Sequence, residues 1–439
     1  MLTLKRPHLA LHHHQRLWLG LMSLLVIVPA SWQGLEGRLT RQSLYNYEFS
    51  LAAYQNREEP IERSIAFYEG RIQQQPDDGL DLAALAGAYL KMAQVTGEES
   101  WYLLAEQSAQ QSLANLSFNN DGALLVLARV AEATHDFTAA LQLSQQADGV
   151  EAKAIQVTTL LAMGEVNAAA EIAADLVDQV PSLGSLTLRG LTQVAQGKRA
   201  AALADFEQAI AVEEPGDLAG SAWVRTLLGR LYTQQGQHRQ AAQLYREALE
   251  ILPNYPLAHL ELAALETRLG RYESAERHYA VVDVPVALHG IARVRTLQGQ
   301  SVNALWAQAE AALRQHVDEN TLGHRRDLAH LLLERGQTED VERAIALLET
   351  ESQNRRDAET LHLLAWALTQ ADRWQAAQAV MQEALGHGLQ DAGLFYRAGT
   401  IESALGNSSQ AERYFQKAKQ IDPTFDQQAQ RHLGLATQL

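Results

Sequence analysis

The sequence predicts an all-α solenoid of paired antiparallel helices, and two observations support this fold class. The first is a spacing that occurs twice: GRLYTQQGQHRQAAQLYREALEILP begins at Gly229, and GTIESALGNSSQAERYFQKAKQIDP begins at Gly399. Both segments place an alanine, an aromatic residue, a second alanine and a proline at the same intervals after the glycine. Small residues let two helix backbones approach closely, the aromatic ring fills the neighbouring groove, and proline ends the second helix.

The second observation is a glycine that lies five residues before an alanine. At this place the first helix of a pair must end in a left-handed cap, which glycine adopts without steric cost. The interval recurs along the chain, and the glycines concerned are Gly164, Gly197, Gly236, Gly270, Gly299 and Gly406. The repetition indicates an array of helix pairs joined by similar turns.

The length of the repeat follows from the first small residue of each pair. Ala263 lies 34 positions after Gly229, and Gly399 lies 34 positions after Ala365. In these intervals the chain resembles the tetratricopeptide-repeat family, and the resemblance implies a right-handed superhelical solenoid. The best units are residues 222–255 and 392–425, and weaker units follow from Ala86, Ala128, Val157, Gly190, Ala263, Ala292, Ala329 and Ala365.

We expect six segments along the chain. They are a basic segment at 1–16, a signal anchor or signal peptide at 17–32, leading helices and an entry half-repeat at 33–77, irregular repeats at 78–221, further repeats at 222–425 and a capping helix at 426–439. Two departures from the regular spacing predict an extended loop at TGEESW, after Ala86, and a widened turn between Arg335 and Ala344.

The N-terminal stretch LWLGLMSLLVIVPASW, residues 17–32, carries no charge and follows a basic segment, which predicts a hydrophobic helix for export or anchoring. The run is slightly shorter than the roughly 20 residues that a spanning helix needs, and the small residues around Ala30 would suit a signal peptidase. The long basic segment and Trp32 argue against cleavage. We favour an uncleaved single pass with extracytoplasmic repeats. A secreted or periplasmic protein after cleavage is the alternative, and a buried apolar helix is a third interpretation.

The composition excludes several classes of function. The formal net charge of −16 argues against a nucleic-acid binder, because such proteins need basic surfaces. The chain has no cysteine, which excludes disulfides, thiolate metal sites and cysteine nucleophiles. The sequence also has no HExxH motif and no glycine-rich phosphate loop. Asp327, His330 and Glu334 share a helix face, which we interpret as a solvated repeat surface. We expect no catalytic residue, cofactor or metal.

In the family that the chain resembles, the first helix of each pair lines a concave groove. Positions three before and one after the small residue lie on one helix face, and none of those counted from Gly229 onward is a carboxylate. The candidate partner-binding residues on this face are Arg230, His289, Arg293, Arg326, His330, His362, Trp366 and Tyr396. Guanidinium and aromatic groups in this pattern predict a groove for an extended peptide. The alternative is that these side chains only solubilise the inner face.

The sequence therefore predicts a non-catalytic scaffold or adaptor, tethered to a membrane by its N-terminal helix or exported, that binds an extended segment of a protein partner. The alternative from another class is a carrier or accessory subunit of an enzyme complex that associates with envelope polysaccharide or peptidoglycan. The few aromatic residues in the predicted groove could stack on sugars.

Overall fold

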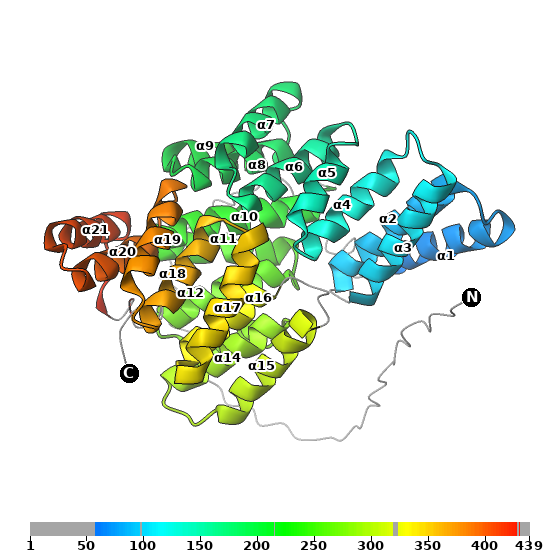
Figure 1. Ribbon diagram of the computed structural model, residues 1–439. Coiled ribbons are helices and arrows are strands. Elements are labelled where there is room, and N and C mark those ends of the chain that lie inside the picture. Colours follow the sequence, from blue (N-terminus) through cyan, green and yellow to red (C-terminus); the bar gives the residue numbers. More distant parts are fainter. Residues whose placement is uncertain (1–57, 97–98, 215, 319–323, 428–429, 431–439) are drawn as a thin grey trace, which may run out of the picture. The chain divides into compact units, whose positions relative to one another are not determined.

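The computed structural model describes residues 58–96, 99–214, 216–318, 324–427 and 430 of the 439-residue chain. The chain divides into two units, Met1–Asn46 and Tyr47–Leu439, and the described residues all belong to the second. Their regular structure is entirely helical, which confirms the all-α prediction (Figure 1). The helices are α1 Glu58–Gln74, α2 Gly79–Thr96, α3 Glu99–Asn115, α4 Asp121–Ala133, α5 Phe137–Ser144, α6 Val150–Met163, α7 Val166–Gln179, α8 Leu183–Ala195, α9 Arg199–Ala211, α10 Leu218–Gln234, α11 His238–Ile251, α12 Pro256–Arg268, α13 Tyr272–Tyr279, α14 Pro285–Leu297, α15 Asn303–Asp318, α16 Arg325–Arg335, α17 Thr338–Asn354, α18 Ala358–Gln370, α19 Trp374–Gly386, α20 Ala392–Ala404 and α21 Ser408–Ile421.

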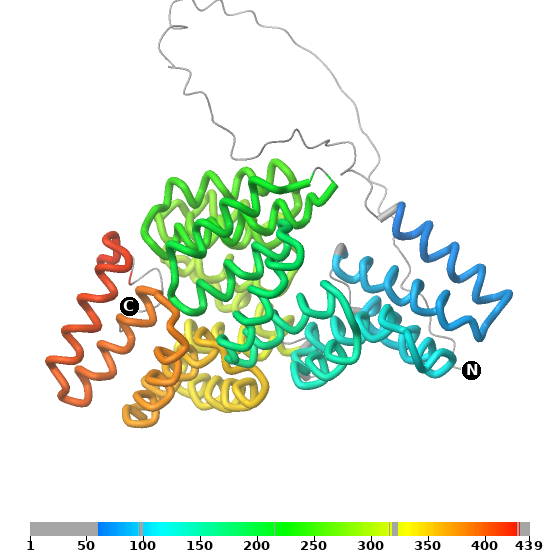
Figure 2. Tube along the Cα trace, turned by 90° about the horizontal axis from the view of Figure 1, so that it is seen from above, coloured from blue at the N-terminus to red at the C-terminus, as the bar shows by residue number. Residues whose placement is uncertain are grey.

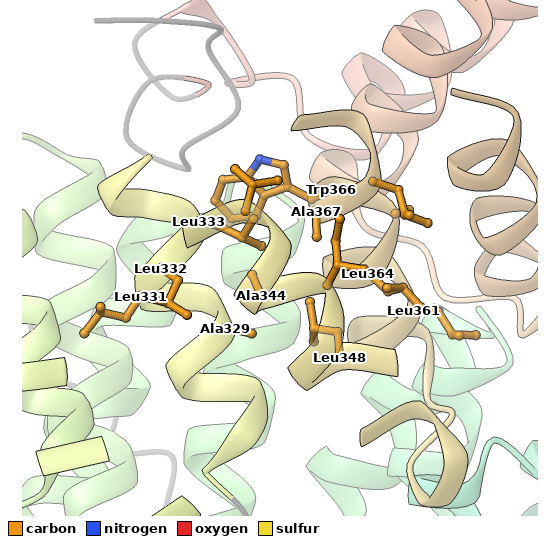
Figure 3. Close-up of a cluster of buried hydrophobic side chains, with 14 of the residues drawn as sticks. Ala329, Leu331, Leu332, Leu333, Ala344, Leu348, Leu361, Leu364, Trp366 and Ala367 are labelled. Carbon is orange, nitrogen blue, oxygen red and sulfur yellow. The ribbon is translucent and has the colours of Figure 1, made fainter. Parts of the chain in front are cut away.

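Helices α2 to α21 form successive pairs, each packed against the next (Figure 1). The first helix of each pair contains one of the small residues that define the predicted repeats. All of these residues are buried: Ala86, Ala128, Val157, Gly190, Gly229, Ala263, Ala292, Ala329, Ala365 and Gly399. Burying the contact faces between neighbouring pairs spreads the hydrophobic core along the array. Figure 3 shows one part of that core, where Leu332 of α16 and Leu364 of α18 lie close to Ala344 of α17.

The predicted glycine turns adopt the left-handed conformation. All six glycines have positive φ, from 71° at Gly236 to 84° at Gly164. His135 and Asp372 occupy the equivalent place in two other pairs, with φ of 60° and 56°. A left-handed residue at this place is therefore a property of the turn, and glycine is its preferred occupant.

The small residue and the aromatic ring of a repeat are in direct contact. A Cβ atom placed on Gly229 would lie 2.5 Å from Cε1 of Tyr245, and one on Gly399 would lie 2.6 Å from Cε1 of Phe415. Tyr245 is fully buried, so its ring has no solvent-exposed space into which it could move. The two backbones can therefore approach this closely only if the residue has no side chain.

We predict that Gly229→Ala lowers the free energy of unfolding by about 1–3 kcal/mol, because the new methyl group overpacks the contact with Tyr245. Gly70→Ala is the matched control, since no atom outside its own helix lies within 4 Å of a Cβ there. The control should gain about 0.5–1 kcal/mol from the higher helix propensity of alanine. Urea unfolding followed by circular dichroism measures both. A Gly229→Ala protein as stable as Gly70→Ala would contradict this account of the repeat.

Two predictions about the turns are wrong. Helix α2 continues ten residues past Ala86 to Thr96, and α3 begins at Glu99, so the inserted residues lengthen the helices. Likewise, α16 ends at Arg335 and α17 begins at Thr338, which leaves a short connection. An added helical turn satisfies its backbone hydrogen bonds internally, whereas a longer loop would need other partners for them.

Later repeats pack against the turns of earlier ones. The backbone amide of Arg356, between α17 and α18, donates a 2.9 Å hydrogen bond to the carbonyl of Ala162 in α6. Arg199 of α9 donates a 2.8 Å hydrogen bond to the carbonyl of Gln390, between α19 and α20. Similar contacts join His135 to Glu351 and Arg268 to Asp422. The array therefore curves until its C-terminal pairs meet its central ones, as the green and orange segments of Figure 2 show.

The structure describes no helix that is long and apolar enough to cross a membrane within the ranges given above. The predicted hydrophobic helix at 17–32 lies outside the described residues, as do the basic segment at 1–16 and most of the predicted capping helix at 426–439.

Candidate partner-binding surface

Five of the eight predicted groove residues come together on the first helices of three consecutive pairs. His289 and Arg293 lie on α14, His330 on α16, and His362 and Trp366 on α18. Glu334 of α16 and Arg397 of α20 complete the group. We call these seven residues the inner cluster. Hydrogen bonds, ion pairs and ring contacts connect them from α14 to α20.

Glu334 is the anionic centre of the inner cluster. Its carboxylate lies 2.8 Å from Nε2 of His289, 3.2 Å from Nε of Arg293 and 3.4 Å from Nε2 of His330. Burial would raise the pKa of the Glu334 carboxyl, but the charge of Arg293 and the contacts with both histidines outweigh it and hold this pKa well below its usual range. Glu334 is therefore ionised, and it neutralises the charge of Arg293.

The expectation that this face of α16 is solvated is wrong for Glu334, whose side chain is only 6% exposed. Side chains of α14 cover it, and His289 in turn packs beside Trp306 at 5.5 Å between ring centroids. Burial lowers the pKa of His289. Glu334 lies five residues after Ala329, outside the positions counted from the sequence, which is why the predicted groove contained no carboxylate.

The other half of the inner cluster is cationic and aromatic. The guanidinium of Arg397 lies 4.4 Å from the ring centroid of Trp366, and its Nε donates a 3.0 Å hydrogen bond to Nε2 of His362. Burial lowers the pKa of Arg397 to about 9. Burial and the charge of Arg397 together hold the pKa of His362 well below its usual range. His330 joins the two halves, because its ring meets that of Trp366 edge-on at 5.8 Å.

The remaining predicted residues lie elsewhere. Arg230 of α10 pairs with Glu261 at 3.1 Å and with Glu359 at 3.2 Å. Arg326 of α16 reaches the same Glu359 at 3.5 Å. Both arginines are therefore engaged by carboxylates of this chain. Tyr396 packs on Phe425, at 5.4 Å between ring centroids, near the C-terminal end of the described array.

A cavity of about 310 Å³ adjoins the pair of Arg230 and Glu359. Its walls are mostly apolar side chains of α6, α8 and α10, and Arg355 and Asp357 add charge beside them. The cavity exists because the connection between α17 and α18 packs against α6. The sequence did not indicate this cavity, because residues far apart in the chain form its walls.

The side chains of the inner cluster are of kinds that form ion pairs, hydrogen bonds and stacking contacts with ligands. The inner cluster presents a guanidinium stacked on an indole, a partly exposed imidazole, and a carboxylate that its neighbours already neutralise. Within the described parts of the chain, no three histidine, aspartate or glutamate side chains are placed to hold a metal ion.

Comparison with known proteins identifies the class. Residues 182–254, 233–284 and 392–425 match tetratricopeptide-repeat models, so these parts of the chain are tetratricopeptide repeats. The photosystem I assembly protein Ycf3 of Synechococcus elongatus is 29% identical over 97 residues, which make up 20% of this chain and 55% of that protein. Ycf3 of a second Synechococcus strain matches to the same extent. The chain thus spans about half the length of these curated relatives.

Among solved structures, the crystal structure of a thermophilic tetratricopeptide-repeat protein from Thermus thermophilus is similar to part of this chain. It is 19% identical, and the match covers 41% of this chain and 98% of that one, with a TM-score of 0.36.

Proposed function

We propose that this protein is a non-catalytic scaffold that holds an extended segment of a protein partner along the face of α14, α16, α18 and α20 that carries the inner cluster, which we call the inner face. The observation that supports it is the inner cluster, in which His330, Trp366 and Arg397 of consecutive first helices are in contact with one another. The side chain of His330 is 38% exposed and accessible to a ligand. An extended peptide that crosses these helices can contact one repeat after another.

The relatives add a second argument for a scaffold. Ycf3 is named as a photosystem I assembly protein, and a role in assembly agrees with a scaffold that holds a protein partner. We include in the proposal that residues 17–32 tether the chain in a single pass with the repeats on the extracytoplasmic side. The support for this tether is the uncharged run that follows a basic segment. The alternative form is a protein released by cleavage near Ala30.

The choice of test residue follows from burial. Trp366 is only 6% exposed and belongs to the hydrophobic core, so its removal would damage the fold together with the groove. His330 is more exposed, and Glu334 keeps His289 and Arg293 as partners when the imidazole is removed. His330→Ala is therefore the cleaner variant.

We expect His330→Ala to reduce the recovery of the partner at least tenfold when the full chain, tagged at its C-terminus, is captured from its native cells. Arg413→Ala is the control, because Arg413 is exposed on α21, the second helix of its pair. Quantitative mass spectrometry measures recovery, and circular dichroism checks that both variants fold. Equal recovery with His330→Ala and Arg413→Ala would place the partner outside the inner face.

A further inference from the structure

Arg397 is a buried cation that has no carboxylate partner among the described residues. The residue is 7% exposed, and the contacts of its guanidinium are the ring of Trp366 and the Nε2 atom of His362. Neither of its terminal amino groups donates a hydrogen bond to a described residue. The indole ring of Trp366 covers the plane of the guanidinium, and Nε donates its hydrogen bond to His362. The edge that carries the two terminal amino groups therefore has no hydrogen-bond partner among the described residues.

This arrangement differs from that of other buried arginines in the chain. Arg225 is fully buried and forms a two-pronged pair with Glu213. The buried side chain of Arg268 pairs with Asp422. Burying a charge is costly unless an opposite charge compensates it. A cation–π contact and one neutral imidazole compensate Arg397 only in part, and the lowered pKa of Arg397 agrees with that.

The surroundings favour an anion at this place. Glu334, the carboxylate of the inner cluster, is already engaged by His289, His330 and Arg293. The free edge of a guanidinium matches the two oxygens of a carboxylate, which it binds with two parallel hydrogen bonds. The chain as a whole carries a net charge of −16, which disfavours the binding of an acidic segment. A local site for an anion would therefore determine where such a segment can bind.

We propose that Arg397 binds the carboxylate of an aspartate or glutamate side chain in the extended segment that the inner face holds. The inference rests on the proposed function and adds the chemistry of the partner to it. Trp366 and His362 are positioning residues in this site, because the ring orients the guanidinium plane and the imidazole fixes its Nε. The partner segment is therefore acidic at the residue that lies over α18 and α20.

The test uses the full chain and two fluorescent dodecapeptides of equal length, which carry glutamate or glutamine at the same four positions and are otherwise glycine, serine and leucine. Fluorescence anisotropy should show binding of the glutamate peptide at least tenfold tighter than binding of the glutamine peptide. Arg397→Met should bind both peptides equally weakly. Arg413→Met, which removes an exposed arginine from α21, should keep the tenfold preference.

A purely structural role for Arg397 makes different predictions. If Arg397 served only to hold α20 against α18, Arg397→Met would lower the melting temperature, and the unaltered chain would bind both peptides equally. If Arg397 forms an anion site, we expect instead that Arg397→Met leaves the melting temperature unchanged or raises it. Methionine can still pack on Trp366, and the substitution removes an uncompensated buried charge.

The outcomes also separate this inference from the proposed function. If the glutamate peptide shows no preference while His330→Ala still abolishes capture of the partner, the inference about Arg397 is wrong and the scaffold function stands. If neither peptide binds and His330→Ala has no effect on capture, both proposals fail.

Discussion

Replacing Arg225 with methionine is expected to lower the free energy of unfolding by about 3–5 kcal/mol. Arg225 is 0% exposed, and its guanidinium donates hydrogen bonds of 2.7 and 2.9 Å to the two oxygens of Glu213. It also donates a 2.9 Å hydrogen bond to the carbonyl of Ser221. The substitution leaves the buried carboxylate of Glu213 without its cation, and the cost of that uncompensated charge dominates the effect.

A double-mutant cycle in urea separates this cost from the loss of packing. Arg225→Met and Glu213→Met should each destabilise the chain strongly, and the double variant should lose clearly less than the sum of the two. Arg373→Met is the control, because both side chains of its pair with Glu342 are exposed and its removal should change stability little. Additive losses in the cycle would show that the two buried side chains do not interact as described.

Glu334→Ala is expected to destabilise the chain by about 3–5 kcal/mol, since it removes the anion that compensates Arg293 and accepts a hydrogen bond from His289. Glu334→Gln keeps the size of the side chain and one acceptor oxygen, so it should cost less. Thermal unfolding at neutral pH compares the two variants. A Glu334→Gln protein as stable as the unaltered chain would mean that side-chain volume and hydrogen bonding, and not the charge, account for the role of Glu334.

The same residue predicts a dependence on pH. The pKa of the Glu334 carboxyl lies well below its value in the unfolded chain, so the stability from its ionised form is present above about pH 4.3 and is lost as the pH falls toward the folded value. Glu334→Gln removes this contribution, and its stability should fall less steeply below about pH 4.3. Parallel acid unfolding curves for the two proteins would contradict the ionised, compensated state of Glu334.

The fold could be predicted because its determinants repeat at short range. The contact between Gly229 and Tyr245 and the left-handed turn at Gly236 each lie within one repeat, so the spacing of residue types reveals them. The placement of the insertions could not be predicted in this way. A late alanine shows that residues were added but does not distinguish a longer helix from a longer turn.

The candidate site could be predicted only in part. Counting from the small residues located five members of the inner cluster, but it omitted Arg397, which lies two residues before Gly399 at a position that was not counted. It also treated Trp366 as a groove residue, whereas contacts with α16 and α20 bury most of its ring. The pair of Arg230 and Glu359 joins residues 129 positions apart, and its formation depends on the curvature of the array.

Photocrosslinking in native cells tests the central claim, that the inner face holds the partner. A photoreactive benzoylphenylalanine replaces Ser403, which is exposed on α20, the helix that carries Arg397, or Gln416, which is exposed on α21. We expect a reproducible crosslink to one protein partner from position 403 and none from position 416. A partner that crosslinks from position 416 but not from position 403 would contradict it, because that partner would bind the outer helices.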